Sequence, residues 1–336
     1  MMLFRTSEEV PDDFGPSVVT IGKFDGVHEG HRAIIQKMLA DSASRGARSV
    51  VVTFDRHPLA LLDPARCPPS LAEPRQKAAL LAETGIDATL MLTFDEQLAA
   101  EEAADFVRRV LVDALQAREV LVGQDFRFGR GGAGDAALLR TLGERYGFTV
   151  GEIPDVRDGE SGRRVSSTWI RELLVDGDVA AASKLLGRPP SVRGEVVHGA
   201  QRGRELGYPT ANLEDVTDGL VPADGVYAGW LIDGLAESQT GIRVRRPAAI
   251  SVGDNPTFDD VPRRQVEAYV LDETDLDLYG HIVEVQFVAR LRGISAFDGI
   301  EALTVQMARD VERAREILVA GPMPPLRPTD AARRDQ

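Results

Sequence analysis

Short runs of β-branched and other apolar residues alternate with longer amphipathic segments in the first half of the chain. Five runs have the composition of buried strands: residues 17–21, 49–54, 88–93, 119–122 and 148–153. After the first run, Ile34/Met38 and Ile35/Leu39 stand four positions apart, which predicts one apolar stripe of a helix over residues 32–45. Three more segments predict helices: residues 77–83, 103–115 and 136–146. This alternation predicts a parallel sheet with helices on both faces, which binds ligands at the carboxyl ends of its strands.

The pattern changes near the middle of the chain. Residues 167–174 and 179–186 predict two helices, and Gly187-Arg188-Pro189-Pro190 ends the second one. We place a domain boundary there, which gives domains at residues 16–187 and 188–320. The tail at residues 321–336 is rich in Pro, Arg and Asp and is predicted to be disordered.

Beyond the boundary, apolar residues recur at every second position, which is typical of strands with one buried face. Turn residues separate five such segments: residues 192–197, 225–233, 248–252, 265–271 and 282–291. Several short strands joined by turns predict a β-barrel or a sandwich. One terminal helix is expected over residues 297–319, with Ile300, Leu303 and Met307 on its apolar side.

Composition excludes several classes of protein. The 336 residues include 39 basic and 53 acidic side chains, a net charge of −14, which disfavours nucleic acids and anionic membranes as partners. The single cysteine, Cys67, rules out a disulfide framework within the chain. The N-terminus lacks a signal-peptide pattern, and no apolar run approaches the roughly 20 residues of a membrane span. We expect a cytoplasmic protein that acts on small molecules and needs no obligate protein partner.

A glycine-rich turn follows the first predicted strand. Gly22, Gly26 and Gly30 allow close approach to phosphates, and the helix that follows directs free N–H groups toward them. His28 and His31, three positions apart, can donate hydrogen bonds to charge that develops on a phosphate. The alternatives are an incidental histidine pair and a metal site, for which Asp25 is a nearby carboxylate but an obvious third ligand is lacking.

A second phosphate-binding pattern spans residues 194–212. It lacks the Gly-Lys-Ser/Thr ending of a Walker loop but combines basic side chains, glycines and oxygen ligands. Arg202 and Arg204 supply positive charge, while Thr210 and Asn212 supply oxygen ligands for Mg²⁺. The alternative is an ordinary surface hairpin. Two phosphate sites in one chain predict two consecutive steps on one metabolite.

The first half of the chain resembles the nucleotidyltransferase module of the prokaryotic bifunctional riboflavin kinase/FAD synthetase family. Four stretches carry this resemblance: Gly22-Lys23-Phe24-Asp25-Gly26-Val27-His28-Glu29-Gly30-His31, Thr53-Phe54-Asp55-Arg56-His57-Pro58, Val122-Gly123-Gln124-Asp125-Phe126-Arg127-Phe128-Gly129 and Arg164-Val165-Ser166-Ser167-Thr168 with Arg171. The resemblance implies a Rossmann-like domain in which His28 and His31 bind the phosphates of ATP. It implies that Asp125 lies beside the reacting phosphates or the ribose. The remaining residues implied to bind ATP or its phosphates are Gly22, Phe24, Asp25, Gly26, Arg164, Ser167, Thr168 and Arg171.

The second half resembles the riboflavin kinase module of the same family. The matching stretches are Pro209-Thr210-Ala211-Asn212, Gly225-Val226-Tyr227-Ala228, Ser251-Val252-Gly253-Asp254-Asn255-Pro256-Thr257-Phe258, Val266-Glu267-Ala268-Tyr269 with Leu271-Asp272, and Asp277-Leu278-Tyr279-Gly280. This resemblance implies a riboflavin-kinase-like β-barrel in which Glu267 is the general base and Thr210 and Asn212 hold Mg²⁺. Without it, Glu267 would be an ordinary solvent-facing strand residue. Residues implied to bind ATP or the flavin are Gly199, Arg202, Gly203, Arg204, Gly207, Tyr208 and Pro209.

The implied function is the phosphorylation of riboflavin to FMN with Mg-ATP, followed by adenylylation of FMN to FAD with release of pyrophosphate. One departure stands out, since Arg56 occupies a position where the family usually has proline. It motivates an alternative, a riboflavin kinase whose first module transfers a nucleotide to another acceptor. A second alternative is a flavin-binding protein without catalysis.

Overall fold

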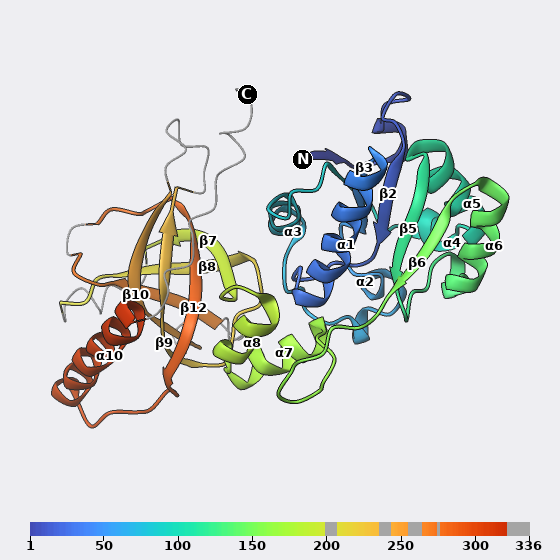
Figure 1. The fold of residues 1–336 in the computed structure, drawn as a ribbon. Coiled ribbons are helices and arrows are strands. Elements are labelled where there is room, and N and C mark those ends of the chain that lie inside the picture. Colours follow the sequence, from blue (N-terminus) through green and yellow to red (C-terminus); the bar gives the residue numbers. More distant parts are fainter. Residues whose placement is uncertain (199–206, 235–242, 255–263, 274–275, 321–336) are drawn as a thin grey trace. The chain divides into compact units, whose positions relative to one another are not determined.

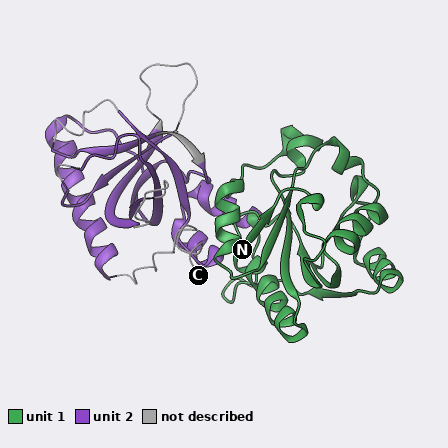
Figure 2. Cartoon of the chain, turned by 90° about the horizontal axis from the view of Figure 1, so that it is seen from above, with its two compact units in different colours: residues 1–167 green, residues 168–336 purple. Residues whose placement is uncertain are grey.

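The computed structural model describes residues 1–198, 207–234, 243–254, 264–273 and 276–320 (Figure 1). Contacts divide the chain into two compact units, Met1–Ser167 and Thr168–Gln336 (Figure 2). The division falls at the first residue of a helix, so the two helices that precede residue 187 are counted with the second unit. The functional boundary after residue 187 stays a prediction.

The first unit contains a six-stranded sheet in the order β1-β4-β3-β2-β5-β6, in which every neighbouring pair is parallel. The strands are β1 (Met2–Phe4), β2 (Ser17–Ile21), β3 (Arg48–Phe54), β4 (Ala88–Leu92), β5 (Ala117–Gly123) and β6 (Thr149–Ile153). The predicted parallel α/β fold is therefore confirmed. The pattern missed β1, because three residues are too short for a periodic signal.

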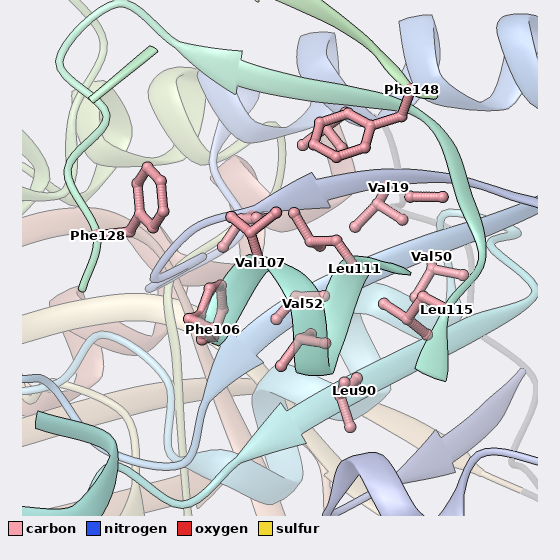
Figure 3. Close-up of a cluster of buried hydrophobic side chains, with 14 of the residues drawn as sticks. Val19, Val50, Val52, Leu90, Phe106, Val107, Leu111, Leu115, Phe128 and Phe148 are labelled. Atoms are coloured by element: carbon pink, nitrogen blue, oxygen red, sulfur yellow. The ribbon is translucent and has the colours of Figure 1, made fainter. Parts of the chain in front are cut away.

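Helices cover both faces of this sheet, as predicted. Alternate residues of a strand point to opposite faces: in β2, Val18 packs in one buried cluster with Ile35 and Met38, whereas Val19 packs in another with Val107 and Leu111. Figure 3 shows the second cluster, in which Val19, Val50 and Val52 of the sheet pack with Val107 and Leu111 of the helix that covers this face.

The helical segments of the first unit are η1 (Ser7–Glu9), α1 (Glu29–Arg45), α2 (Leu59–Leu62), η2 (Pro64–Arg66), α3 (Pro74–Ala82), α4 (Glu96–Ala100), α5 (Ala103–Phe106), the π-helical η3 (Val107–Ala114), η4 (Arg130–Gly132) and α6 (Ala136–Tyr146).

The second unit contains a closed barrel in the order β10-β11-β8-β7-β12-β9, in which the neighbouring strands are antiparallel. This confirms the barrel and not the sandwich. The strands are β7 (Ser191–Val197), β8 (Thr210–Asp218), β9 (Gly225–Asp233), β10 (Val244–Asp254), β11 (Arg264–Val270) and β12 (Ile282–Arg292). The pattern missed β8, whose Asn, Asp and Glu residues have low strand propensity.

Three helices among the described residues accompany the barrel: α7 (Ser167–Asp176), α8 (Val179–Leu186) and the terminal α10 (Ile300–Ala320). The apolar side of α10 places Ala314 and Leu318 in a buried cluster with Trp230 of the barrel. An ion pair fixes the same helix to β12, because Arg292 Nε lies 2.9 Å from Asp310 Oδ2. Among the described residues, no helix combines the length and apolar character that crossing a membrane requires.

Candidate functional site

The strand order of the first unit locates its site. β2 lies in the middle of the sheet, and the chain continues to β3 and β4 on one side and to β5 and β6 on the other. In sheets of this kind, ligands bind beyond the carboxyl ends of the strands, at the point where the strand order reverses. The glycine-rich turn follows β2 at that point, and Asp125 follows β5.

The turn between β2 and α1 has an unusual backbone. Phe24 and Val27 have φ angles of +49° and +40°, in the left-handed region that non-glycine residues rarely adopt, and Gly26 has +79°. Both apolar side chains are buried, and the Phe24 ring centroid lies 4.9 Å from that of His31. A Cβ at Gly22 would lie 3.1 Å from the Phe24 ring, so the turn folds tightly back on itself. Packing therefore maintains the strained backbone that positions the histidines.

The two histidines lie together at the start of α1. Their rings are stacked with centroids 3.7 Å apart, and His28 caps the helix, since its Nδ1 accepts a 3.4 Å hydrogen bond from the backbone N–H of His31. Gly30 makes room for this pair, because a Cβ there would lie 3.1 Å from the His28 ring. The predicted pair is thus one rigid unit at a helix N-terminus, where anions bind.

The surroundings of His31 oppose its protonation. Burial is the largest cause that holds the pKa of His31 well below its usual value, and the positive charges of His28, Lys77, Lys23 and Arg164 follow in that order. The same cationic surroundings favour a polyanion. The site thus combines a His31 ring that resists protonation with flanking cations, which suits the phosphates of a nucleotide.

The Asp25 carboxylate is bound by backbone N–H groups of a distant segment, and its predicted contact with ATP stays a prediction. Its Oδ1 accepts hydrogen bonds from the backbone N–H groups of Leu71 and Ala72, at 2.9 and 3.3 Å. Its carbonyl oxygen accepts a 2.9 Å bond from the Ser167 hydroxyl. Asp25 therefore holds neighbouring segments in place. This geometry gives no support to the alternative in which His28, His31 and Asp25 bind a metal.

A cluster of three charged side chains, Arg164, Asp125 and Asp155, lies near the carboxyl end of β5. Arg164 forms ion pairs with Asp125 and, at 3.1 Å, with Asp155. The structure thus brings together two residues that the sequence predicted, Asp125 and Arg164, and adds Asp155. Ser167 and Thr168 form the first turn of α7, and Arg171 lies one turn further along. Whether these residues bind phosphate stays a prediction.

Arg56 lies two residues after the end of β3, at the carboxyl end of the sheet. Its side chain is 52% exposed, and its Nε lies 3.5 Å from Asp55 Oδ1. The Asp55 carboxylate also accepts a 3.0 Å hydrogen bond from the backbone of Phe94. The cation is thus available at the edge of the site, beside a carboxylate that is fixed by the backbone.

In the second unit, strand register brings the predicted kinase residues together. Glu267 of β11 pairs directly with Asn212 of β8, and Tyr269 pairs with Thr210. Their neighbours Ala211 and Ala268 are buried, so by strand alternation the four polar side chains share the opposite face. Directly opposed residues have Cβ atoms about 4.5–5.5 Å apart. This places Glu267 beside the Thr210–Asn212 pair.

The kinase residues also show suitable chemistry. Burial raises the pKa of Glu267, which brings this carboxyl closer to the range of a general base. Asn212 Nδ2 lies 3.1 Å from the Thr210 carbonyl and 3.3 Å from its Oγ1, so both side chains converge. Hydroxyl, amide and carboxylate oxygens are the donors that Mg²⁺ prefers. Among the described residues, no group of three His, Cys, Asp or Glu side chains could hold a metal, so a Mg²⁺ fit rests on the hydroxyl and the amide.

The remaining predicted kinase residues that the structure describes lie directly before β8. Gly207 has a φ angle of +83°, and Tyr208 and Pro209 lead directly into the strand. The Tyr208 ring packs edge-on against Tyr269, with centroids 5.1 Å apart. Four predicted residues lie outside the described part of the chain: Gly199, Arg202, Gly203 and Arg204.

One residue in the first site escaped the sequence analysis. Lys77 of α3 is only 5% exposed and donates a 2.9 Å hydrogen bond to the carbonyl oxygen of Phe54, at the end of β3. A lysine in an amphipathic helix usually faces solvent, so no pattern in the chain pointed to this burial.

Comparison with known proteins agrees with this geometry. Residues 10–169 match the FAD synthetase family model, and residues 186–318 match the riboflavin kinase model. The bifunctional riboflavin kinase/FMN adenylyltransferase of Escherichia coli K12 is 38% identical over 89% of this chain and 92% of its own length. The protein of the same name from Pseudomonas fluorescens is 36% identical over 94% of this chain and 98% of its own length.

A solved structure extends the similarity to the fold. A crystal structure described as a macrolide-efflux protein from Streptococcus pneumoniae has a TM-score of 0.82 and 32% sequence identity. The match covers 94% of this chain and 99% of that one. The two family models match consecutive parts of the chain, and the bifunctional relatives match across most of its length. The chain therefore belongs to the family of bifunctional riboflavin kinase/FMN adenylyltransferases.

Proposed function

We propose that this chain makes FAD from riboflavin in two steps, the first in the barrel unit and the second in the α/β unit. The observation that carries the proposal is the register that sets Glu267 opposite Asn212, in a chain whose other unit holds a stacked histidine pair at a helix N-terminus. The Glu267–Asn212 pair suits the transfer of the γ-phosphoryl group of ATP, and the histidine pair suits the transfer of AMP from ATP. Riboflavin, FMN and ATP are the small-molecule substrates, and FAD is the final product.

In the kinase step, Glu267 takes the proton from the 5′-hydroxyl of riboflavin as that oxygen attacks the γ-phosphorus of ATP. The bond to the bridging oxygen breaks, ADP leaves and FMN forms. A raised pKa favours this role, because a base whose pKa is close to the working pH transfers protons efficiently. Thr210 and Asn212 would hold Mg²⁺, which neutralises phosphate charge when bound. Tyr208 would contact the flavin.

In the adenylyl-transfer step, a phosphate oxygen of FMN attacks the α-phosphorus of a second ATP, and pyrophosphate leaves. No nucleophile from the protein is required. His28 and His31 donate hydrogen bonds to the phosphates, the N-terminus of α1 faces them, and Lys23 and Arg164 supply positive charge. Gly22 and Gly26 allow the close approach of the chain to ATP. We further propose that the enzyme works in the cytoplasm, where ATP is available.

A time course tests both steps. The purified full-length chain is incubated with riboflavin, ATP and Mg²⁺, and riboflavin, FMN and FAD are separated at intervals. We expect FMN to rise before FAD. FMN without FAD would favour a different acceptor for the first unit and direct attention to Arg56, whereas flavin binding without turnover would favour a non-catalytic protein.

A further inference from the structure

A polar side chain that the proposed chemistry does not use lies next to Glu267. Strand β10 pairs with β11 in a register that sets Ser251 directly opposite Glu267, and β8 sets Asn212 opposite Glu267 from the other side. Directly opposed residues of neighbouring strands share one face of a sheet, with Cβ atoms about 4.5–5.5 Å apart. Asn212, Glu267 and Ser251 therefore form one row of polar side chains across three strands.

The neighbours of Ser251 along β10 show which face it lies on. Ile250 and Val252 are 0% exposed, whereas Ser251 is half-buried. Because side chains alternate along a strand, the hydroxyl lies on the face that turns away from these two core residues, together with the proposed base. Val197 of β7 and Val226 of β9 bound the row at its two ends. The row is thus a short polar patch between apolar side chains.

The face of β10 is closed in one direction from Ser251 and open in the other. Toward the start of the strand, Ala249 packs in a buried cluster with side chains of α10. Toward its end, a Cβ at Gly253 would meet only the Ile294 side chain among the described residues, at 3.9 Å. A molecule held at Glu267 can therefore extend past Ser251 toward Gly253, and α10 blocks the opposite direction.

The geometry of phosphoryl transfer assigns the two sides of Glu267 to different substrates. The attacking and leaving oxygens lie roughly in line, on opposite sides of the transferred phosphorus. Thr210 and Asn212, which would hold Mg²⁺ and with it the phosphates of ATP, lie on the β8 side of Glu267. The acceptor alcohol then approaches from the β10 side, where Ser251 lies.

We propose that Ser251 is a specificity-determining residue of the kinase site, whose hydroxyl forms a hydrogen bond with the 4′-hydroxyl of riboflavin while the 5′-hydroxyl meets Glu267. The inference rests on the proposed function. The two hydroxyls stand on adjacent carbons of the ribityl chain, and the two side chains stand opposite each other on adjacent strands, so each oxygen can meet its own partner. Holding the 4′-oxygen restricts rotation about the last carbon–carbon bond, which keeps the 5′-oxygen near the base.

Recognition by this hydrogen bond selects among alcohols. A site that hydrogen-bonds a substrate hydroxyl discriminates against an analogue that lacks it, because the polar group of the protein is then left unpaired. The analogue 4′-deoxyriboflavin should therefore be a poor acceptor, although its 5′-hydroxyl is intact.

The test combines one change in the protein with one change in the substrate. Binding of riboflavin and of 4′-deoxyriboflavin to the full-length chain is measured by quenching of flavin fluorescence, with Mg²⁺ and ADP present, for the parent, Ser251→Ala and Ser251→Thr. We expect Ser251→Ala to raise the Kd and the KM for riboflavin by about 3- to 10-fold, and the KM for ATP by less than about twofold. Ser251→Thr keeps the hydroxyl and should restore the parent values.

The two changes should remove the same contact, so their effects should not add. We expect the parent to bind 4′-deoxyriboflavin about 3- to 10-fold more weakly than riboflavin. Ser251→Ala should bind the analogue as tightly as the parent does. FMN adenylylation, which we assign to the first unit, should keep the parent rate in both variants.

Two results would overturn the inference. One is a loss in Ser251→Ala that multiplies with the loss caused by the analogue, and the other is a parent protein that binds the analogue as tightly as riboflavin. The second measurement needs no variant, so it decides the matter even if Ser251→Ala does not fold. If binding follows the expected pattern but the parent makes no FMN, the inference about Ser251 stands and the proposed kinase step fails.

Discussion

Glu267 has two opposing effects, one on stability and one on catalysis. Its pKa in the folded chain is raised above the usual 4.5. A carboxyl with a raised folded pKa stabilises the fold fully below its unfolded pKa, and this contribution is lost as the pH rises through the folded pKa. At neutral pH the buried carboxylate therefore lowers the free energy of unfolding. The barrel therefore keeps Glu267 although its charged carboxylate lowers the stability of the fold.

We expect Glu267→Gln to raise the free energy of unfolding at pH 7 and to have little effect below about pH 4, since the parent carboxyl is then protonated. Denaturant titrations at both pH values measure this. The same variant should slow riboflavin phosphorylation by about 10²–10⁴-fold and leave conversion of FMN to FAD in place. A variant that phosphorylates riboflavin at the parent rate would contradict the role of Glu267 as the base.

Gly30 is required for space and not for its backbone freedom. An added Cβ would lie 3.1 Å from the His28 ring and 3.4 Å from the Val165 carbonyl, so the ring must shift by a few tenths of an ångström. We expect Gly30→Ala to slow FMN adenylylation by about tenfold or more, because small displacements of catalytic groups have large effects on rate. Gly159→Ala is the control, since a Cβ there meets nothing within 4 Å. Equal rates in the two variants would show that the placement of His28 has no importance for the reaction.

The sequence was informative for residues whose chemistry depends on local spacing. His28 and His31 share a turn, and Thr210 and Asn212 share a strand face, so their proximity could be predicted. The carboxylate of Asp25 could not be interpreted, because the N–H groups that it binds lie more than 40 residues further along the chain. Such partners are set by tertiary packing, which leaves no periodic signal.

At the scale of elements, α10 depends on one buried ion pair as well as on its apolar side. Asp310 is 7% exposed, and its carboxylate forms an ion pair with two nitrogens of the Arg292 guanidinium. The Gln306 side chain donates a further 2.9 Å hydrogen bond to the same carboxylate. Removing the carboxylate would leave the guanidinium largely buried without its anion. Such a loss is more costly than replacing both partners.

We therefore expect Asp310→Ala to destabilise the protein by about 3 kcal/mol. Thermal unfolding followed by circular dichroism measures the loss. The neighbouring Arg309 is exposed, so Arg309→Ala serves as the control and should change stability by less than about 0.5 kcal/mol. Equal melting temperatures for the two variants would show that the ion pair does not hold α10.

Elements were predicted well where a strong pattern coincided with buried surface. The bounds predicted for β2, α6, α8 and β9 agree with the structure to the residue. β8 was missed because only Ala211 and Leu213 mark its buried face near the start, while polar residues and a glycine-rich approach suggested a loop. The helix predicted over residues 103–115 was correct in place, but most of it is π-helical, a distinction that side-chain periodicity does not make.

For the whole molecule, the change of hydrophobic period from helical to alternating near residue 190 was enough to predict two units of different class. Glu267, Thr210 and Asn212 lie in the second unit, and His28 and His31 lie in the first. The strand register pairs Glu267 with residues of the barrel alone, and the histidine pair lies within the first unit. The two activities should therefore be separable.

Mixing two variants that are each impaired in one step tests this separation. Glu267→Gln alone should make FAD from riboflavin only at its strongly reduced rate of phosphorylation, and His28→Ala with His31→Ala should stop at FMN. We expect a mixture of the two proteins to make FAD after a lag, because FMN released by one chain can be adenylylated by the other. The lag should shorten as protein concentration rises. A mixture that accumulates FMN without FAD would contradict independent sites.

The pairing of Glu267 with Asn212 also limits how the gene can change. Hydrogen bonds between β8 and β11 fix this pair, whatever the length of the connections outside those strands. A residue inserted into a connection leaves the pair facing the same side, but one residue inserted within either strand turns all subsequent side chains to the other face. Related chains should therefore differ in length between their strands, and a single-codon insertion between Thr210 and Leu213 should be absent from every active descendant.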